Sequence, residues 1–375
     1  EAISCGRQRL HDSMQKLEEK SYASASVYGV SSIREALPPL MHTVETTFHK
    51  LKNGQAGKFY REISEYVDDL EPIAISTIIL KITFDRVFST QRGANLVTPT
   101  LVAIGSALES ECKFRWYKHK YPGLMHYISD KYFHDACGTM QKQIIASKKF
   151  GERNIRWKPW SIKAKTSIGR WGLSIVMETT QWFTISKRKT HRKRYEYRVV
   201  PTPEFNTKRA ELIKSAELFA GIPWPMLVVP DDWGYNENNE IIYGGYLTNR
   251  MMKGHDLTRK GNPLIIHGET PINFLNKLQR VKYRVNSHIL QVAVEMRLRG
   301  RIVGKFIPIS PAFKPPRPPN ADDNPDANLA WRRAMAEAHN ADRINFKRSV
   351  RTRTQMEAAE KFKDDVFHLC WSYDY

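Results

Sequence analysis

Apolar residues recur at helical spacing along most of the chain, and this period limits the fold more than any other feature. Residues 32–51 show it clearly, with apolar side chains at Ile33, Leu37, Leu40, Met41, Val44 and Phe48. A stripe with that period lies along one face of a helix and packs against a neighbouring element. Similar stripes predict helices over residues 60–67, 72–88, 96–118 and 121–150. The sequence therefore predicts a mainly α fold with a few β-hairpins.

Helix-start signals mark a second helical part of the chain. Thr270-Pro271 combines a capping hydroxyl with a proline at the first helical position, and an apolar stripe follows. This predicts one long helix over residues 270–300. The proline-rich residues 308–319 cannot form a helix and are expected to be an extended connector. Two more helices are predicted over residues 324–339 and 348–369.

Residues 182–200 follow a different period. Apolar or aromatic residues alternate with polar ones on both sides of a polar tip, which is the pattern of a β-hairpin. Two further strands are predicted over residues 225–230 and 241–247. A turn-rich loop at residues 231–239 separates them.

The composition limits the class of partner. The chain has 375 residues, 41% of them hydrophobic, and a net charge of +20. That charge favours an anionic partner, first nucleic acid and second an anionic membrane surface, with an inert basic surface as the alternative. The best apolar run, residues 72–80, is too short to span a membrane. The four cysteines form no C-x-x-C pair, which argues against a zinc site or a disulfide framework and suits a reducing cytosol.

The densest charge lies at the tip of the predicted hairpin. Its cationic residues are Lys187, Arg188, Lys189, Arg192, Lys193 and Arg194, with His191 at the apex. Cations this close repel one another, and salt screens that repulsion only partly. Binding to phosphates relieves the repulsion and releases counterions. The tip is therefore predicted to bind nucleic acid, and a solvated loop is the alternative.

A smaller basic segment surrounds the break after the first strong helix. Lys50, Lys52 and Lys58 flank two glycines there. A basic loop of this kind fits an A·T-rich minor groove, where negative potential is concentrated. An ordinary turn between helices is the alternative.

Basic residues also follow one predicted helix face near the C-terminal end. Arg343, Lys347 and Arg351 are spaced four residues apart, and Arg348 lies beside them. Such a row can follow a nucleic-acid backbone. A solvated helix face is the alternative.

Catalytic patterns are absent from the sequence. It contains no Walker loop, no G-x-S-x-G and no H-E-x-x-H. Four acidic pairs lie beside turn or surface signals: Asp68-Asp69, Asp231-Asp232, Asp322-Asp323 and Asp364-Asp365. Adjacent carboxylates on a helix point in different directions. No metal site is therefore predicted in this chain.

Four segments, taken in order, resemble motifs of the phage-type single-subunit RNA polymerases. Residues 225–233 read P-M-L-V-V-P-D-D-W and precede G-G-Y at 244–246, similar to P-x-x-V-P-P-x-x-W … G-G-Y of that family. Residues 279–286 resemble its Q-x-x-x-W-x-x-N thumb helix, with Tyr283 in the tryptophan position. Residues 324–334 resemble N-P-x-x-x-x-A-W-K-R-A, and residues 362–375 resemble the approach to the palm.

The resemblance implies a parent DNA-directed RNA polymerase of the right-hand type. Its helical N-terminal promoter-binding domain would cover residues 1–268, its helical thumb residues 269–362, and the first edge of its palm residues 363–375. In that family two palm aspartates hold metal ions for nucleotidyl transfer, and they would lie beyond Tyr375. The chain is expected to hold no cofactor and to be inactive alone, whereas the full-length enzyme would need Mg²⁺.

The resemblance also implies roles for the basic segments. Residues 50–58 fall on the loop that reads A·T-rich upstream promoter DNA in the minor groove. Residues 186–195 fall on the hairpin that holds the melted upstream edge of the bubble. Gln279 belongs to the thumb motif, and residues 343–348 fall on the thumb segment that grips the RNA–DNA hybrid.

The hairpin departs from the family in one respect. No aliphatic residue lies between Lys187 and Arg194, so a simple apolar wedge is missing. Electrostatic capture of the separated strands, with Tyr195 or His191 stacking on a base, is the expected substitute.

The expected partners are double-stranded promoter DNA, melted single strands and an RNA–DNA hybrid, bound by a monomer without a membrane. The expected location is the cytoplasm of a bacterial host, with a mitochondrion or a plastid as the alternative. A stand-alone, non-catalytic nucleic-acid-binding protein would share the same composition and is the alternative function.

Overall fold

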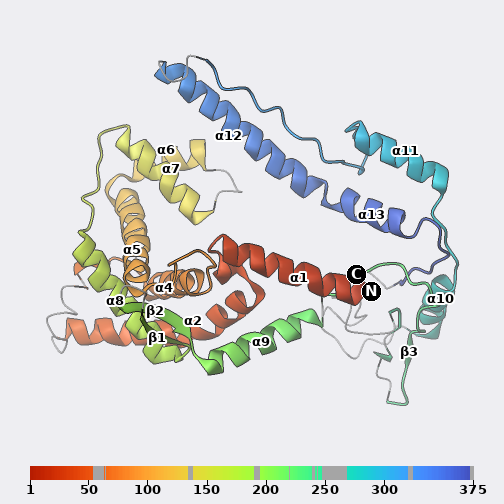
Figure 1. Ribbon diagram of the computed structural model, residues 1–375, viewed down its shortest axis with the longest axis horizontal. Helices are drawn as coiled ribbons and strands as arrows, with labels where there is room; N and C mark the ends of the chain where they lie inside the picture. The colour runs from red at the N-terminus through yellow and green to blue at the C-terminus, as the bar shows by residue number, and fades with distance from the viewer. Residues whose placement is uncertain are drawn as a thin grey trace. The chain divides into compact units, whose positions relative to one another are not determined.

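The computed structural model of the chain describes residues 1–53, 63, 65–133, 138–189, 195–218, 220–238, 241–242, 244–246, 268–319 and 324–371. Helices dominate these ranges, so the predicted mainly α fold is confirmed (Figure 1). The chain divides into an N-terminal unit, Ser4–Ala220, and a C-terminal unit made of Glu1–Ile3 and Gly221–Tyr375. The predicted domain boundary at residue 268 borders a stretch outside the described ranges, so the domain assignments stay predictions.

Helices build most of the N-terminal unit. In chain order the elements are α1 (Ala2–Glu19), η1 (Ala23–Ala25), α2 (Val27–Lys52), α4 (Pro72–Val87), α5 (Val97–Lys120), α6 (Pro122–Tyr132), α7 (Thr139–Gly151), α8 (Ile162–Thr180), β1 (Phe183–Lys189), β2 (Tyr195–Pro201) and α9 (Pro203–Glu217). The helices predicted over residues 32–51, 72–88 and 96–118 are confirmed as α2, α4 and α5. Of the helix predicted over residues 60–67, the structure describes 63 and 65–67, which are helical.

The single helix predicted over residues 121–150 is wrong, because α6 and α7 are separate helices. They lie side by side at one end of α5 (Figure 1). Phe150 of α7 stacks on Tyr117 of α5, with ring centroids 4.0 Å apart, and both rings are buried. Met125 and Ile128 of α6 complete this small second core. Burying Phe150 against α5 requires the chain to fold back, which one continuous helix would prevent.

Aromatic packing fixes the base of the hairpin formed by β1 and β2. Phe183, at the start of β1, meets Phe84 of α4 edge-on, with ring centroids 5.4 Å apart. Phe205 of α9 lies 5.7 Å from the same Phe84 ring, and all three rings are buried. The strands pair antiparallel from Phe183 with Pro201 to Lys189 with Tyr195, so the hairpin predicted over residues 182–200 is confirmed.

Two glycines bring α5 and α8 into backbone contact. A Cβ atom on Gly105 would lie 2.2 Å from the carbonyl oxygen of Lys165, and one on Gly169 would lie 1.9 Å from that of Leu101. Neither distance is possible for a real side chain. The crossing therefore requires glycine at both positions, since only glycine lets the helix backbones approach so closely.

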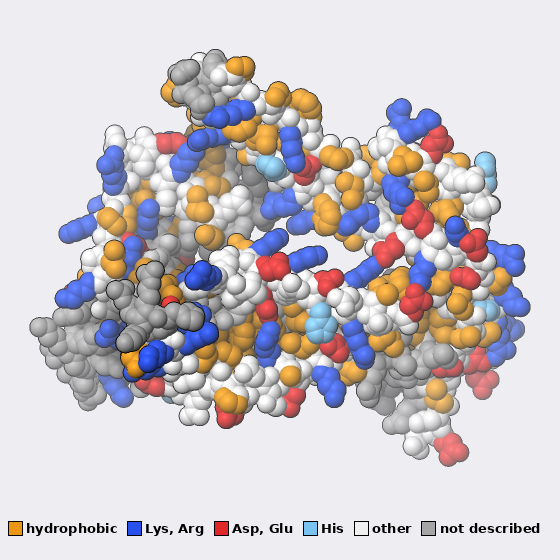
Figure 2. Space-filling model, viewed as in Figure 1, with side chains coloured by type: hydrophobic (Ala, Val, Ile, Leu, Met, Phe, Trp, Pro, Cys, Tyr) orange, Lys and Arg blue, Asp and Glu red, His pale blue; other side chains and the backbone are white. Residues whose placement is uncertain are grey.

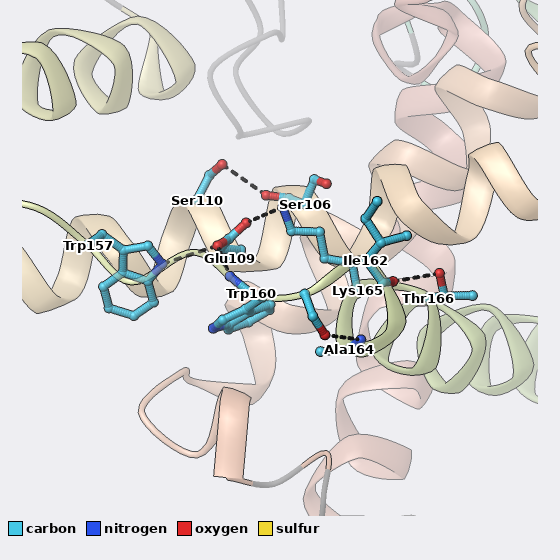
Figure 3. Close-up of polar contacts among 10 residues, drawn as sticks. Ser106, Glu109, Ser110, Trp157, Trp160, Ile162, Ala164, Lys165 and Thr166 are labelled. Carbon is cyan, nitrogen blue, oxygen red and sulfur yellow. Dashed lines mark hydrogen bonds and ion pairs between the residues drawn. The ribbon is translucent and has the colours of Figure 1, made fainter.

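A buried carboxylate fastens the same pair of helices to the segment between α7 and α8. Glu109 of α5 accepts hydrogen bonds from the indole N–H of Trp157 (3.2 Å) and the backbone N–H of Trp160 (2.6 Å). The ammonium group of Lys165 on α8 lies 2.8 Å from its other oxygen (Figure 3). One side chain therefore joins three parts of the unit.

The C-terminal unit contains β3 (Gly234–Tyr235), β4 (Ile241–Ile242), α10 (Glu269–Gln279), α11 (Ser287–Leu298), α12 (Pro325–Arg348) and α13 (Val350–Lys361). The long helix predicted over residues 270–300 is wrong, because it is interrupted between α10 and α11. Tyr283 leaves the helix and pairs with Phe367 through two backbone hydrogen bonds of 2.8 and 3.0 Å. Asn286 then caps α11 by accepting from the N–H of Ile289 (3.1 Å).

The other predicted bounds in this unit also need correction. Residues 225–230 form no strand; Met226 makes one bridge to His368, and the side chains of residues 227–229 are about half exposed. The strand predicted over 241–247 is reduced, within its described residues, to Ile241–Ile242 and a bridge at Gly245. The helix predicted over 324–339 extends to Arg348, and the one predicted over 348–369 ends at Lys361.

The proline-rich connector lies along α12 (Figure 1). As predicted, residues 308–319 form neither helix nor strand. The indole N–H of Trp331 donates to the carbonyl oxygen of Pro315 (3.0 Å), and the Asn345 amide donates to that of Ser310 (3.0 Å). Asp342 accepts from the backbone N–H of Ala312 at 2.7 Å and faces the Lys314 ammonium at 3.4 Å. Side chains of α12 therefore hold the connector.

We expect Asp342→Ala to release the connector from α12. The Ala312 N–H and then Lys314 hold the pKa of the Asp342 carboxyl below its usual range. A lowered pKa in the folded chain stabilises the contact above the unfolded value of about 3.9, and the effect is lost as pH falls through the folded value. Hydrogen exchange at the Ala312 amide should be faster in the variant at neutral pH. In the wild type the protection factor of this amide, its intrinsic rate divided by its observed rate at the same pH, should fall only in acid. Equal exchange rates in both proteins at neutral pH would contradict this.

Candidate nucleic-acid interface

One face of the hairpin combines cations with aromatic rings. Residues directly opposite each other in an antiparallel pair point to the same side of the ribbon. The pairs Lys187 with Tyr197 and Lys189 with Tyr195 therefore share one face. The Lys187 ammonium lies 4.0 Å from the centroid of the Tyr195 ring, and that tyrosine is 54% exposed. This face can offer both positive charge and a ring surface to a nucleic acid.

The opposite face of the hairpin and the outer edge of β2 anchor it to the residues just before α5. Arg188 lies opposite Glu196, and Arg198 forms an ion pair with Glu196 (2.9 Å). Arg198 also donates to the side-chain oxygen of Asn95 (3.2 Å), and the backbone N–H of Val199 donates to the Asn95 carbonyl (2.9 Å). These bonds orient the ribbon, so the cationic and aromatic face is presented by a fixed base.

The predicted interface residues are only partly within the described ranges. Lys187, Arg188 and Lys189 are exposed on β1. Lys50 is exposed near the end of α2, and Lys52 is its last residue. The remaining predictions on these two segments lie outside the described residues: Lys58, His191, Arg192, Lys193 and Arg194.

Of the four basic residues named near the C-terminal end, Arg343, Lys347 and Arg348 lie on α12, whereas Arg351 lies on α13, so the predicted single helix face is interrupted at Ser349. Arg343, Lys347 and Arg348 are all exposed. Arg343 donates to the side-chain oxygen of Asn340 (2.9 Å), and no described acidic residue forms an ion pair with any of the three. Their positive charge is therefore available to a phosphate backbone. The role itself stays a prediction.

The structure does not support the predicted contact between Gln279 and nucleic acid. Gln279 is fully buried at the end of α10. Its side-chain N–H donates to the carbonyl oxygen of Asp231 (2.9 Å), and its oxygen accepts from the backbone N–H of Trp371 (3.3 Å). The side chain therefore joins two distant segments, and its amide is already satisfied by backbone groups.

The chain shares sequence with two phage proteins over most of its length. No family model matches the chain. The chain is 22% identical to "DNA-directed RNA polymerase" of Enterobacteria phage K11 over 308 residues, which is 77% of this chain and 33% of that protein. It is 21% identical to "T7 RNA polymerase" of Escherichia phage T7 over 350 residues, which is 88% of this chain and 38% of that protein. The chain is related to the phage-type RNA polymerases. It spans about a third of the length of these relatives.

The described ranges of this chain contain no metal site of the usual kind. No group of three or more His, Cys, Asp or Glu side chains there is arranged to hold a metal ion. No helix in the described ranges is both long and apolar enough to cross a membrane.

Sequence reasoning missed another basic surface of the chain, on α6 and α7. Its charge was visible, because residues 113–158 contain eleven Lys or Arg and three Asp or Glu. Lys and Arg side chains lie on the surface over these helices (Figure 2). The sequence did not reveal this surface, because its basic residues are spread along residues 113–158 and form no local cluster. Helix packing is what brings them together.

Proposed function

We propose that this chain is the nucleic-acid-binding part of a phage-type DNA-directed RNA polymerase. The observation that carries the proposal is the hairpin face formed by Lys187, Lys189, Tyr195 and Tyr197, in a relative of two phage RNA polymerases. Stacking rings beside cations are suited to unpaired strands, because every base has a flat face and every nucleotide a phosphate. The hairpin would hold the melted edge of a promoter bubble.

The other exposed cations extend this proposal. Lys50, at the end of α2, would approach upstream promoter DNA, and the α12 residues Arg343, Lys347 and Arg348 would grip an RNA–DNA hybrid. The place of action would be the cytoplasm of an infected bacterium, because both relatives are phage proteins. Nucleotidyl transfer is assigned to no residue of this chain. The relationship to polymerases favours this function over a stand-alone binding protein.

We expect the triple variant Lys187→Gln, Arg188→Gln, Lys189→Gln to bind bubble DNA roughly tenfold more weakly, since it removes several phosphate contacts. The slope of log affinity against log salt should also fall in magnitude by about 2, at about 0.7 per contact with a single strand. Fluorescence anisotropy on a duplex with a central mismatched bubble measures both quantities. Tyr195→Ala should weaken binding without changing the slope, because stacking releases no counterions.

A matched control keeps the net charge change the same. Lys16, Lys20 and Lys214 are exposed lysines elsewhere in the N-terminal unit. Changing all three to glutamine should leave the affinity for the bubble close to that of the wild type. If the hairpin triple variant binds as tightly as this control, with the same salt slope, the proposed role of the hairpin is wrong.

A further inference from the structure

One edge of the β1–β2 hairpin is open to a further strand. The outer edge of β2 is covered near its base, because the backbone N–H of Val199 donates to the Asn95 carbonyl (2.9 Å) and Leu96 bridges Arg198. No described strand pairs with the outer edge of β1, and residues 184–189 are all exposed. In the described part of the hairpin, the free strand edge is therefore that of β1.

The register of the hairpin decides which backbone groups lie on that edge. The Thr202 N–H donates to the Trp182 carbonyl (2.9 Å), which extends the ladder by one pair beyond Phe183 and Pro201. In an antiparallel ladder, pairs that exchange hydrogen bonds alternate with pairs whose N–H and C=O groups point away from the partner strand. The pair of Phe183 with Pro201 is therefore of the outward kind, and a proline there removes no bond between the strands. By the same alternation, the further outward residues of β1 are Ile185, Lys187 and Lys189.

These three exposed residues offer their backbone to a partner. Each has one N–H and one C=O directed away from β2, and no described group outside the hairpin bonds to them. Phe183, by contrast, is buried at the base of the hairpin. A strand laid along residues 185–189 would satisfy the outward groups as a third strand of a sheet does, which is how extended peptides bind to sheet edges.

The charges of β1 decide which strand fits this edge. Lys187, Arg188 and Lys189 are consecutive, so their cations lie on both faces of the ribbon. Glu196, opposite Arg188, is already paired with Arg198 at 2.9 Å. A second copy of β1 would bring like charges together across the new pair, which is unfavourable. An acidic strand would instead place carboxylates beside the cations.

We propose that the outer edge of β1 binds an extended acidic segment of a partner protein by β-strand addition. Main-chain hydrogen bonds to Ile185 and Lys187 fix the register of the segment, and its carboxylates face the cations of β1. An apolar side chain of the segment covers Ile185, which is 45% exposed. Binding of the segment does not depend on the proposed function. Its consequence does, because a segment that occupies these cations would exclude bubble DNA from the hairpin.

The test compares two fluorescein-labelled peptides that alternate glutamate and valine, added to the full chain. One has ordinary amides, and the other carries a methyl group on every backbone nitrogen, so it keeps the charge but has no N–H to donate. Fluorescence anisotropy should show roughly tenfold weaker binding of the methylated peptide. The ordinary peptide should also slow hydrogen exchange at the outward amides of Ile185 and Lys187. The amides of Ser186 and Arg188, already bonded to β2, should change much less.

Two variants of one residue test the backbone contact from the side of the protein. Ile185→Pro removes an outward N–H without removing a bond to β2, and it should weaken binding of the ordinary peptide roughly tenfold. Ile185→Ala loses the side chain but keeps the N–H, so it should bind more tightly than Ile185→Pro. The Lys16, Lys20 and Lys214 triple variant should bind like the wild type. Equal affinity for the two peptides, or unchanged exchange at Ile185 and Lys187 with saturating peptide, would overturn the proposal and leave a contact of charges only.

Competition with bubble DNA separates this inference from the proposed function. Unlabelled ordinary peptide should displace labelled bubble DNA from the chain, and simultaneous binding of both would show that the segment does not exclude DNA. If the hairpin triple variant binds bubble DNA like the wild type while the peptide slows the two outward amides, the proposed function fails and the peptide site stands. If that variant loses bubble DNA and the peptide slows neither amide, the peptide site fails and the proposed function stands.

Discussion

Gly169→Ala is expected to destabilise the N-terminal unit by about 3 kcal/mol, because it forces two helix backbones apart. The new Cβ atom would lie 1.9 Å from the carbonyl oxygen of Leu101. A backbone atom cannot rotate away as a side chain can, so α5 and α8 must separate. Separation would loosen the buried Ile104 and Trp171 that pack in the same core. Urea unfolding followed by circular dichroism would measure the loss as a lower midpoint.

Gly172→Ala provides a matched control in the same helix. Its Cβ atom would meet side-chain atoms only, with Cδ1 of Ile79 at 3.0 Å and Cγ2 of Ile104 at 3.3 Å. These methyl groups can shift by a few tenths of an ångström. Alanine also favours a helix over glycine by about 1 kcal/mol, which offsets the crowding. We expect a midpoint near that of the wild type. Equal midpoints for the two variants would show that the α5–α8 crossing tolerates a methyl group.

Local patterns explain which elements could be predicted from the sequence. The hairpin is encoded within residues 182–200, where alternation and a polar tip determine both its strands. The long helix predicted over 270–300 failed because its apolar stripe continues through the interruption. What ends α10 is pairing between Tyr283 and Phe367, which are far apart in the sequence. No local pattern in residues 270–300 reveals that partner.

In the candidate site, too, local features could be predicted from the sequence and features that depend on long-range packing could not. The charge at the hairpin is a local property, so Lys187, Arg188 and Lys189 were found from the sequence, and all three are exposed. Gln279 was misassigned because its motif did not indicate burial, which depends on Asp231 and Trp371. The basic surface on α6 and α7 was missed for the related reason that only the fold brings Tyr127 close to Arg153.

Glu109→Ala is expected to cost about 3 kcal/mol, because it leaves several partly buried partners unsatisfied at once. The Glu109 carboxylate accepts hydrogen bonds from Trp157 and Trp160 and forms an ion pair with Lys165. Glu109 itself is 8% exposed. In the variant the indole and backbone N–H groups lose their acceptor, and the Lys165 ammonium, whose side chain is 20% exposed, loses its counter-charge. The midpoint of urea unfolding should fall. Hydrogen exchange at the Trp160 amide should become faster.

The variant Glu109→Gln tests how much of this loss of stability comes from the negative charge and how much from the shape of the side chain. Glutamine has nearly the same volume and keeps one oxygen, which can accept from the Trp160 N–H or from the Trp157 indole. It cannot offset the charge of Lys165, so we expect a loss smaller than that of alanine but still measurable.

Lys165 and Gly105 lie at the same α5–α8 contact, because the Lys165 carbonyl is the atom nearest a Cβ on Gly105. Loss of the ion pair should therefore also weaken the helix crossing, making Glu109→Ala and Gly169→Ala non-additive when combined. Strictly additive losses in the double variant would show that the carboxylate and the crossing are independent.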